Sequence, residues 1–171
     1  KNIIIDSKSG YSGAGRGVHK KYKDKNLYES LSAYGVSNHR HNSEIQQELK
    51  LNMKKVVEFS FTPHLTPMFR GILSTIYVNL NKNISHDKVF KYLRKYYKSK
   101  TFIKIMSNIY ISTNDVINTN LCHISVCTTK YKNKLVILSA IDNLIKGGSG
   151  QAVQNLNNKF SFPEKMGLTW E

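Results

Sequence analysis

The amino-acid sequence predicts an α+β fold in which helices cover a mixed or antiparallel sheet. Three observations lead to this prediction. Runs rich in β-branched residues alternate with helical patterns, two runs are joined by a short polar turn, and no Gly/Ser/Pro-rich linker divides the chain. The 171 residues are 40% hydrophobic, which is enough to enclose one core. We therefore expect residues 1–171 to form a single domain.

Strands are indicated by runs rich in isoleucine, valine, threonine and tyrosine. In chain order these runs are Asn2–Ile5, Val56–Thr62, Gly71–Leu80, Thr101–Ile105, His123–Thr129 and Lys134–Ile141. The last two flank a polar turn and are expected to pair as antiparallel neighbours. The glycines and serines of Ser7–Gly17 predict a loop, and Pro63 is expected to end the second strand.

Three helices are predicted from apolar spacing and capping residues. They run from Asn42 or Ser43 to about Leu51, from about His86 to Lys98, and from Gly147 to Asn158. Ser85 is the expected N-cap of the second helix. Its predicted inner face consists of Val89, Phe90, Leu93 and Tyr97, and that of the third helix consists of Ala152, Val153 and Leu156.

The net charge of +15 raises the question of nucleic-acid binding. Only four of the 26 basic residues are arginine, the residue best suited to bidentate phosphate and base contacts. Tyr96 and Tyr97 lie beside lysines and could stack on bases, but their spacing favours the inner face of a helix. We therefore interpret the lysines as solvated surface residues and expect no nucleic-acid partner.

Membrane insertion and secretion are not indicated either. No apolar run approaches the 18 residues that a membrane-spanning helix needs. Two cysteines, Cys122 and Cys127, do not make a disulfide framework, and both are interpreted as buried core thiols. We expect a reduced, cytoplasmic protein.

The first motif is Ser-Gly-Tyr-Ser-Gly-Ala-Gly-Arg at residues 9–16. Its glycines allow backbone N–H groups to form an anion-binding nest, to which Ser9, Ser12 and Arg16 would add donors. The alternative is an ordinary glycine-rich loop. The spacing matches neither the dinucleotide-binding fingerprint nor a P-loop.

The second motif, at residues 34–45, places Arg40 between His39 and His41 just before a predicted helix. In extended backbone, residues two apart face the same side, so both histidines could enter one cleft. A histidine suits proton transfer near neutral pH, and Arg40 could hold a carboxylate or phosphate. The alternatives are an exposed histidine pair and, less favoured, a zinc site. No metal site is expected, because no cysteine or third histidine stands nearby at ligand spacing.

Two further motifs lie at residues 61–72 and 141–152. In the first, two prolines stiffen a turn before a strand, and Arg70 is the better candidate for anion binding, whereas His64 is more consistent with a structural turn. In the second, Asn143 carries an amide that can donate and accept at once, as a carboxamide ligand requires. The glycines after it indicate close approach by other backbone or by a cofactor.

Together these four motifs, in this order, resemble the second half of the N-acetyl-γ-glutamyl-phosphate reductase family. The resemblance implies a glyceraldehyde-3-phosphate dehydrogenase-like C-terminal domain that binds substrate and builds a dimer or tetramer. It also implies NADPH-dependent reduction of an acyl phosphate to an aldehyde in arginine biosynthesis, through a cysteine thioester.

The resemblance also assigns roles to residues. His41 or His39 would be the acid–base residue. Arg16, Arg40, Arg70 and Ser12 would be substrate contacts, and Ser9, Gly10 and Asn143 would meet the nicotinamide of NADP. Most of the NADP would be held by a nucleotide-binding domain, on which the last helix, at about residues 146–158, would pack.

The chain departs from the family pattern in two ways. It contains neither the Rossmann glycine fingerprint nor the Gly-Cys-Tyr-Pro-Thr nucleophile motif. We therefore expect a fragment of a larger reductase that, alone, neither reduces substrate nor binds NADP tightly. Two alternatives stay open: a related semialdehyde dehydrogenase domain that acts on another acyl phosphate, and a basic nucleic-acid-binding module.

Overall fold

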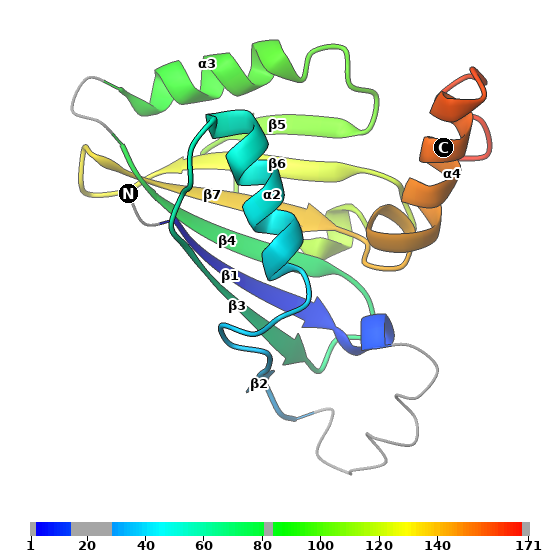
Figure 1. Ribbon diagram of the computed structural model, residues 1–171, viewed down its shortest axis with the longest axis horizontal. Coiled ribbons are helices and arrows are strands. Elements are labelled where there is room, and N and C mark those ends of the chain that lie inside the picture. Colours follow the sequence, from blue (N-terminus) through cyan, green and yellow to red (C-terminus); the bar gives the residue numbers. More distant parts are fainter. Residues whose placement is uncertain (1–2, 15–28, 81–83, 169–171) are drawn as a thin grey trace.

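A seven-stranded open sheet forms the centre of the computed structural model, which describes residues 3–14, 29–80 and 84–168. The strand order is β2-β3-β1-β4-β7-β6-β5. The pairs β1–β3 and β5–β6 are parallel, and the other neighbours are antiparallel. Helices α2 and α3 lie on one side of this sheet, and α4 lies beyond one end of it (Figure 1). The predicted α+β class with a mixed sheet is confirmed.

The strands are β1 Ile3–Gly10, β2 Ser32–Ala33, β3 Phe59–Thr66, β4 Ile72–Asn79, β5 Ile103–Ser107, β6 Cys122–Thr128 and β7 Lys134–Ile141. The predicted antiparallel pairing of the last two strands is confirmed. The prediction of a loop from Ser7 was wrong, because β1 continues to Gly10. Ser7 can lie inside the sheet since its hydroxyl hydrogen-bonds that of Ser74 at 2.7 Å.

Pro63 does not end β3 as predicted. Its carbonyl oxygen accepts a hydrogen bond from the N–H of Tyr34, on the side of β3 where β2 lies. In a strand, the nitrogen and the carbonyl of one residue point to the same side, so the nitrogen of Pro63 also points toward β2. The two-residue β2 pairs only with Leu65 and His64 and does not extend to Pro63. The missing N–H of Pro63 therefore removes no bond of the ladder.

The helices are α2 Asn42–Met53, α3 His86–Tyr96 and α4 Gly150–Lys159, with a π-helical turn at Ile145–Ser149 before α4. Short 3-10 turns, η1 and η2, span Tyr11–Ala14 and Thr113–Asp115. Ser85 caps α3 as predicted, because its hydroxyl accepts from the N–H of Lys88. Helix α2 instead begins after His41, so neither predicted cap precedes it.

The predicted inner face of α4 was wrong. Val153 and Leu156 are 39% and 50% exposed, and Ala152 is exposed as well. Gly150 and Asn157 face inward instead. A Cβ atom on Gly150 would lie 2.5 Å from Oδ1 of Asn120. This close approach, rather than apolar spacing, determines which side of α4 faces the rest of the domain.

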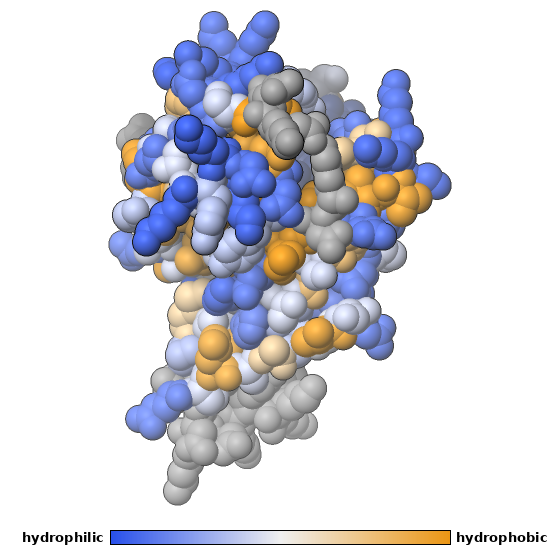
Figure 2. Space-filling view, turned by 90° about the vertical axis from the view of Figure 1, so that its left-hand side faces the viewer, coloured by the Kyte–Doolittle hydropathy of each residue, from blue (hydrophilic) through white to orange (hydrophobic). Residues whose placement is uncertain are grey.

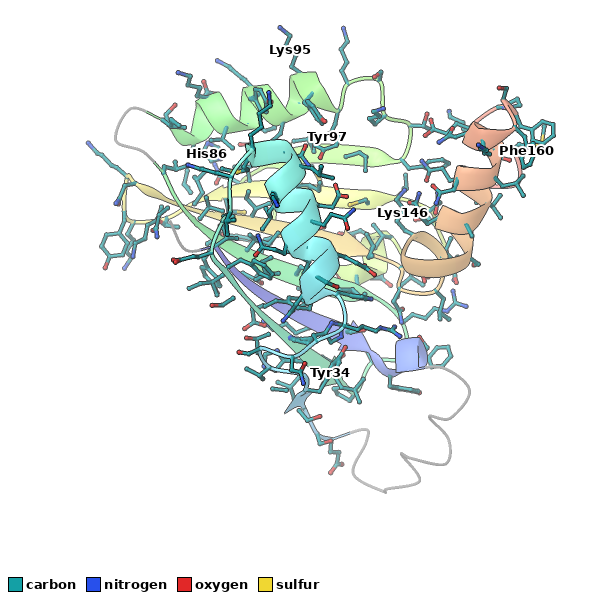
Figure 3. The ribbon with its side chains drawn as sticks, in the orientation of Figure 1. Tyr34, His86, Lys95, Tyr97, Lys146 and Phe160 are labelled. Atoms are coloured by element: carbon teal, nitrogen blue, oxygen red, sulfur yellow. The ribbon has the colours of Figure 1, made fainter. Side chains whose placement is uncertain are left out.

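One prediction for α3 also needs correction. Tyr97 is half-buried, but Tyr96 is 58% exposed, and its ring stacks on that of Tyr92 with the centroids 6.2 Å apart. Figure 3 shows Tyr97 beside the sheet and Lys95 pointing away from it.

Register divides the sheet side chains between two faces. The helix face carries Phe61, whose ring contacts that of His39. Strand register places Cys122 and Val126 on the same face. On the opposite face, the segment 108–121 covers one end of the sheet. Its Ile111 and Val116 form a core with Ala140 of β7, flanked by Leu73 and Leu138.

The surface is largely polar. In the side view of Figure 2, hydrophobic residues form separate patches among hydrophilic ones. Within the described residues, no helix combines the length and the apolar composition that a bilayer-spanning segment needs. Cys122 and Cys127 are both free thiols, the first half-buried and the second buried.

Candidate functional site

Three of the four motifs meet at one end of the sheet. Gly10, at the end of β1, pairs with Thr66 at the end of the parallel β3. Antiparallel β4 begins there, and its first residue, Ile72, pairs with both Ser9 and Ile141. Ser12 and Asn143, 131 positions apart in sequence, are thus neighbours in space.

The glycine turn η1 is held closely by the segment before β4. The N–H groups of Gly10, Tyr11 and Ser12 donate to the carbonyls of Gly71, Met68 and Phe69 at 2.8, 3.0 and 3.1 Å. These three N–H groups therefore cannot form the predicted anion nest. A Cβ atom on Gly10 would lie 2.6 Å from the carbonyl oxygen of Phe69, so backbone packing by itself requires glycine there. Arg16 lies outside the described residues.

Asn143 links this turn to β4. Its Oδ1 atom accepts from the N–H of Gly71 at 2.8 Å, and its Nδ2 atom donates to Oγ of Ser12 at 3.0 Å. The residue is only 7% exposed. Ser9 Oγ donates to the carbonyl of Gly10, and Oγ1 of Thr66 donates to the carbonyl of Ser9. The predicted cofactor contacts Ser9, Gly10 and Asn143 are thus gathered at one place.

Arg70 also lies at this end, but its Nη1 atom is already engaged. It lies 3.1 Å from Oδ2 of the fully buried Asp142 and 2.8 Å from Oδ1 of Asn118. The prediction that Arg70 contacts substrate stays a prediction.

The histidine motif lies over the helix face. The rings of His39 and His41 are 4.7 Å apart, and His39 also contacts the rings of Tyr34 and Phe61 at 5.5 and 5.3 Å. The segment is tied to β3 by strand β2 and by the bond from Tyr34 N–H to the Pro63 carbonyl at 3.0 Å. Figure 3 shows Tyr34 near the C-terminal end of β3.

The backbone N–H of His41 donates to Nδ1 of His39 at 3.2 Å. Burial first, and then the nearby side chains of His41 and Arg40, lower the pKa of His39 from its ordinary value. His39 is therefore largely neutral at pH 7, and because Nδ1 accepts a bond, its proton sits on Nε2. Such an imidazole can donate a hydrogen bond to a carbonyl oxygen or an oxyanion.

The two parts of the candidate site share a face. Phe61, which His39 contacts, and Leu65, the partner of Ser9, both lie on the helix face and are four residues apart along β3. At ~3.3 Å per residue this separation is about 13 Å. Arg40 is exposed, and within the described part of the chain no cluster of three or more His, Cys, Asp or Glu could hold a metal ion.

Sequence reasoning missed Asp142 and Asn118. Asp142 resembles a helix N-cap, since its carboxylate accepts from the N–H groups of Leu144 and Ile145. The sequence contains this local signal, because Asp142 stands just before an apolar segment that begins a helix. Its pairing with Arg70, across 72 positions, left no such signal.

Comparisons with known proteins agree with this arrangement. Residues 1–143 match the family model described as semialdehyde dehydrogenase, dimerisation domain. An N-acetyl-γ-glutamyl-phosphate reductase of Acetivibrio thermocellus is 49% identical over 99% of this chain, and one of Desulforamulus reducens is 47% identical over 98%. A probable chloroplastic N-acetyl-γ-glutamyl-phosphate reductase of Arabidopsis thaliana is 44% identical over 98%.

The chain spans about half the length of these relatives: 49% of each bacterial protein and 42% of the plant protein. Among solved structures, an aspartate semialdehyde dehydrogenase from Francisella tularensis superposes with a TM-score of 0.68 at 13% identity, covering 91% of this chain and 57% of that one. Aspartate semialdehyde dehydrogenase II from Vibrio cholerae gives 0.61 at 14% identity, covering 92% and 55%. At such identities the likeness concerns the fold alone.

Proposed function

This chain belongs to the N-acetyl-γ-glutamyl-phosphate reductase family, and we propose that it forms the substrate-binding and dimerisation domain of such a reductase. The proposed reaction converts N-acetyl-γ-glutamyl phosphate to the semialdehyde in arginine biosynthesis. The observation that carries the proposal is the anchored, neutral His39, which lies on the same face of the sheet as Ser9 and the glycine turn. A hydrogen-bond donor at that place suits an acyl group undergoing reduction.

In the proposed reaction a cysteine thiolate attacks the acyl phosphate, a C–S bond forms and phosphate leaves. When bound, NADPH would supply the hydride that adds to the thioester carbon; the C–S bond then breaks, and the aldehyde and the thiolate are released. The carbonyl oxygen gains negative charge in both steps. We propose that Nε2–H of His39 donates to that oxygen, and that the exposed His41 takes the proton of the attacking thiol and returns it to the released thiolate. Arg40 and Arg16 remain the candidates for the substrate's anionic groups.

Neither cysteine of this chain suits the role of nucleophile. Burial raises the pKa of Cys122, although its contact with Ser139 and the charge of Lys146 act in the opposite direction. Cys127 is only 7% exposed. A nucleophilic cysteine requires a lowered pKa and access to substrate. We therefore propose that the thiolate comes from outside these 171 residues, and that this chain alone is inactive.

The glycine turn fits the carboxamide of a nicotinamide. Asn143 has one N–H bonded to Ser12 and one lone pair bonded to Gly71, which leaves a second N–H and a second lone pair. A Cβ atom on Gly13 would lie 3.1 Å from Nδ2 of Asn143, so glycine there keeps the amide clear. NADP, rather than NAD, is proposed on the family resemblance alone.

Two exposed surfaces support assembly with other parts of the enzyme. On the opposite face, the cross-strand pair Ile4 and Tyr77 is 47% and 48% exposed, and we propose that a second copy covers it. On α4, Leu156 and Phe160 are 50% and 65% exposed. We propose that the nucleotide-binding domain packs there; Figure 3 shows Phe160 on the outer side of the helix. The two free thiols favour a reducing compartment such as the cytoplasm.

A hybrid reductase tests the proposed function. In it, residues 1–171 replace the matching half of the Desulforamulus reducens relative. The reverse reaction is convenient, because N-acetylglutamate semialdehyde, phosphate and NADP⁺ give the acyl phosphate and NADPH, whose absorbance is followed. Lys95→Ala, an exposed change on α3, is the control.

We expect activity with N-acetylglutamate semialdehyde well above that with aspartate semialdehyde. A folded, oligomeric hybrid that prefers aspartate semialdehyde would favour the related dehydrogenase instead. A folded hybrid that oxidises neither compound would reject the proposal.

A further inference from the structure

The carboxylate of Asp142 is fully buried and receives four hydrogen bonds. Its Oδ1 atom accepts from the N–H groups of Leu144 and Ile145 at 2.7 and 3.0 Å. Its Oδ2 atom accepts from the N–H of Asn118 at 2.8 Å and from Nη1 of Arg70 at 3.1 Å. Burial alone would raise the pKa of Asp142, but these donors lower it below the ordinary value. The chain around Asp142 is therefore held from three segments.

Arg70 holds this carboxylate through one of its nitrogens, Nη1. The same Nη1 atom that reaches Asp142 also donates to Oδ1 of Asn118, whose backbone is left-handed with φ of 62°. The side chain of Arg70 is 28% exposed, whereas that of Asp142 is fully buried. An anion that drew Arg70 away would leave a buried carboxylate without its cation, which is strongly unfavourable.

Asn143, the residue after Asp142, connects this anchored segment to the glycine turn. Asn143 is only 7% exposed and is tied by Oδ1 to the N–H of Gly71 and by Nδ2 to Oγ of Ser12. Ser12 lies in η1, directly after the residues proposed to meet the cofactor. The chain of contacts thus runs from Arg70 through Asp142 and Asn143 to Ser12.

We propose that Asn143 is a positioning residue that sets the place of Ser12 and the glycine turn, and that Arg70 acts on this turn only through Asp142. This inference deepens the proposed function and rests on it. It differs from the expectation that Arg70 binds substrate directly. It also differs from a role for Asn143 limited to cofactor contact.

The first test uses Asn143→Ala, Asn143→Asp and Ser12→Ala in the hybrid reductase, with Lys95→Ala as control. Asn143→Ala removes both contacts, so kcat should fall about 10- to 100-fold. Hydrogen exchange in peptides covering residues 9–14 should become faster. In Asn143→Asp the carboxylate still accepts from Gly71 and from the Ser12 hydroxyl, so exchange at residues 9–14 should rise less than in Asn143→Ala.

Combining the changes separates positioning from direct contact. If Asn143 acts through Ser12, adding Ser12→Ala to Asn143→Ala should lower kcat less than about twofold further. The proposal would be overturned if the kcat losses of the two single variants multiplied in the double variant, the KM for NADP⁺ rose, and exchange at residues 9–14 were unchanged.

The second test concerns Arg70. Arg70→Gln and Asp142→Asn should both speed exchange at residues 9–14, and the double variant should be no worse than the more affected single variant. If Arg70 instead binds substrate, Arg70→Gln would raise the KM for semialdehyde or phosphate equally in the parent and in the Asp142→Asn background. That result would overturn the indirect role.

Failure of this inference can be told apart from failure of the proposed function. Hydrogen exchange needs no turnover, so a folded but inactive hybrid still reports whether Asn143 and Arg70 hold the glycine turn. Unchanged exchange in Asn143→Ala and Arg70→Gln would reject the inference even in a fully active hybrid.

Discussion

The backbone N–H of His41 donates to Nδ1 of His39 at 3.2 Å, which anchors the ring of His39. His39 is half-buried with a lowered pKa, whereas His41 is exposed at the start of α2. We therefore propose different roles for the two histidines: His39 donates a hydrogen bond, and the exposed His41 transfers a proton.

His39→Asn should lower kcat of the hybrid reductase on the order of 10²-fold, with KM changed little, because one donor to the developing oxyanion is lost. The kcat of the parent should also fall on acidification below pH 6.5, as His39 loses its neutral form. Steady-state kinetics from pH 5 to 8 measure both effects. His86→Asn on α3 serves as the control histidine, and a loss below threefold in His39→Asn would contradict the assigned role.

Stability should fall on acidification because of His123. This residue is 7% exposed, and its Nε2 atom has no hydrogen-bond partner among the residues that the structure describes. Burial, followed by the charge of Lys104, lowers the pKa of His123, while Asp115 acts to raise it. The unfolded chain takes up a proton near pH 6.5, but the folded chain does so only at lower pH. The part of the free energy of unfolding that comes from neutral His123 is therefore lost as pH falls from 6.5 toward the lowered pKa.

Urea unfolding of the hybrid between pH 7.5 and 5 checks this expectation. One proton contributes a slope of at most about 1.4 kcal/mol per pH unit. His123→Phe should flatten the slope by part of that amount. An unchanged slope in His123→Phe would show that other groups govern the acid sensitivity.

Gly71→Ala should destabilise the fold far more than Gly167→Ala. Both glycines have positive φ, 104° and 72°. A Cβ atom on Gly167 meets nothing within 4 Å, but one on Gly71 would lie 2.6 Å from Cβ of Thr113. Backbone strain alone should cost about 1 kcal/mol at Gly167, and strain plus the clash about 3 kcal/mol or more at Gly71. Thermal unfolding of both variants measures the difference, and equal losses would mean that the Thr113 segment yields easily.

Tyr77→Glu should weaken self-association if the opposite face is the subunit interface. A charge placed beside Ile4 would be buried against the second copy at a high desolvation cost. Tyr110→Glu is the control, since Tyr110 is 89% exposed and belongs to the 108–121 segment rather than to the strands that carry Ile4 and Tyr77. Sedimentation of the hybrid should show smaller species only for Tyr77→Glu. An unchanged oligomer would exclude this pair from the interface.

The local parts of the fold were predictable from the sequence. Ser85 before α3 and the polar turn between β6 and β7 are signals within a few residues, and both are confirmed. The extension of β1 was missed because the polar residues after Ile5 gain their partners from a strand more than 60 positions later, as Ser7 does from Ser74. Periodicity within a short window cannot reveal such partners.

The four motifs do not reveal which of their residues contact one another. The sequence indicated Arg70 as an anion ligand, yet its partner Asp142 is supplied by a distant part of the chain. The same reasoning explains α4. Its apolar spacing suggested an inner face, but Gly150 packs so closely on Asn120 that Val153 and Leu156 are turned outward.

The inner position of β1 affects how this domain folds during synthesis. Of the seven strands, β1 leaves the ribosome first, but both of its neighbours in the sheet, β3 and β4, are made later; Ile3 pairs with Phe59, 56 positions on. At ~5–20 residues per second, the nascent Ile-Ile-Ile run waits roughly 3 to 11 s without these partner strands. The strands β5 to β7 connect to β1 only through β4. Slow translation between residues 10 and 59 would therefore prolong the stage at which the chain is most prone to aggregate and most in need of a chaperone.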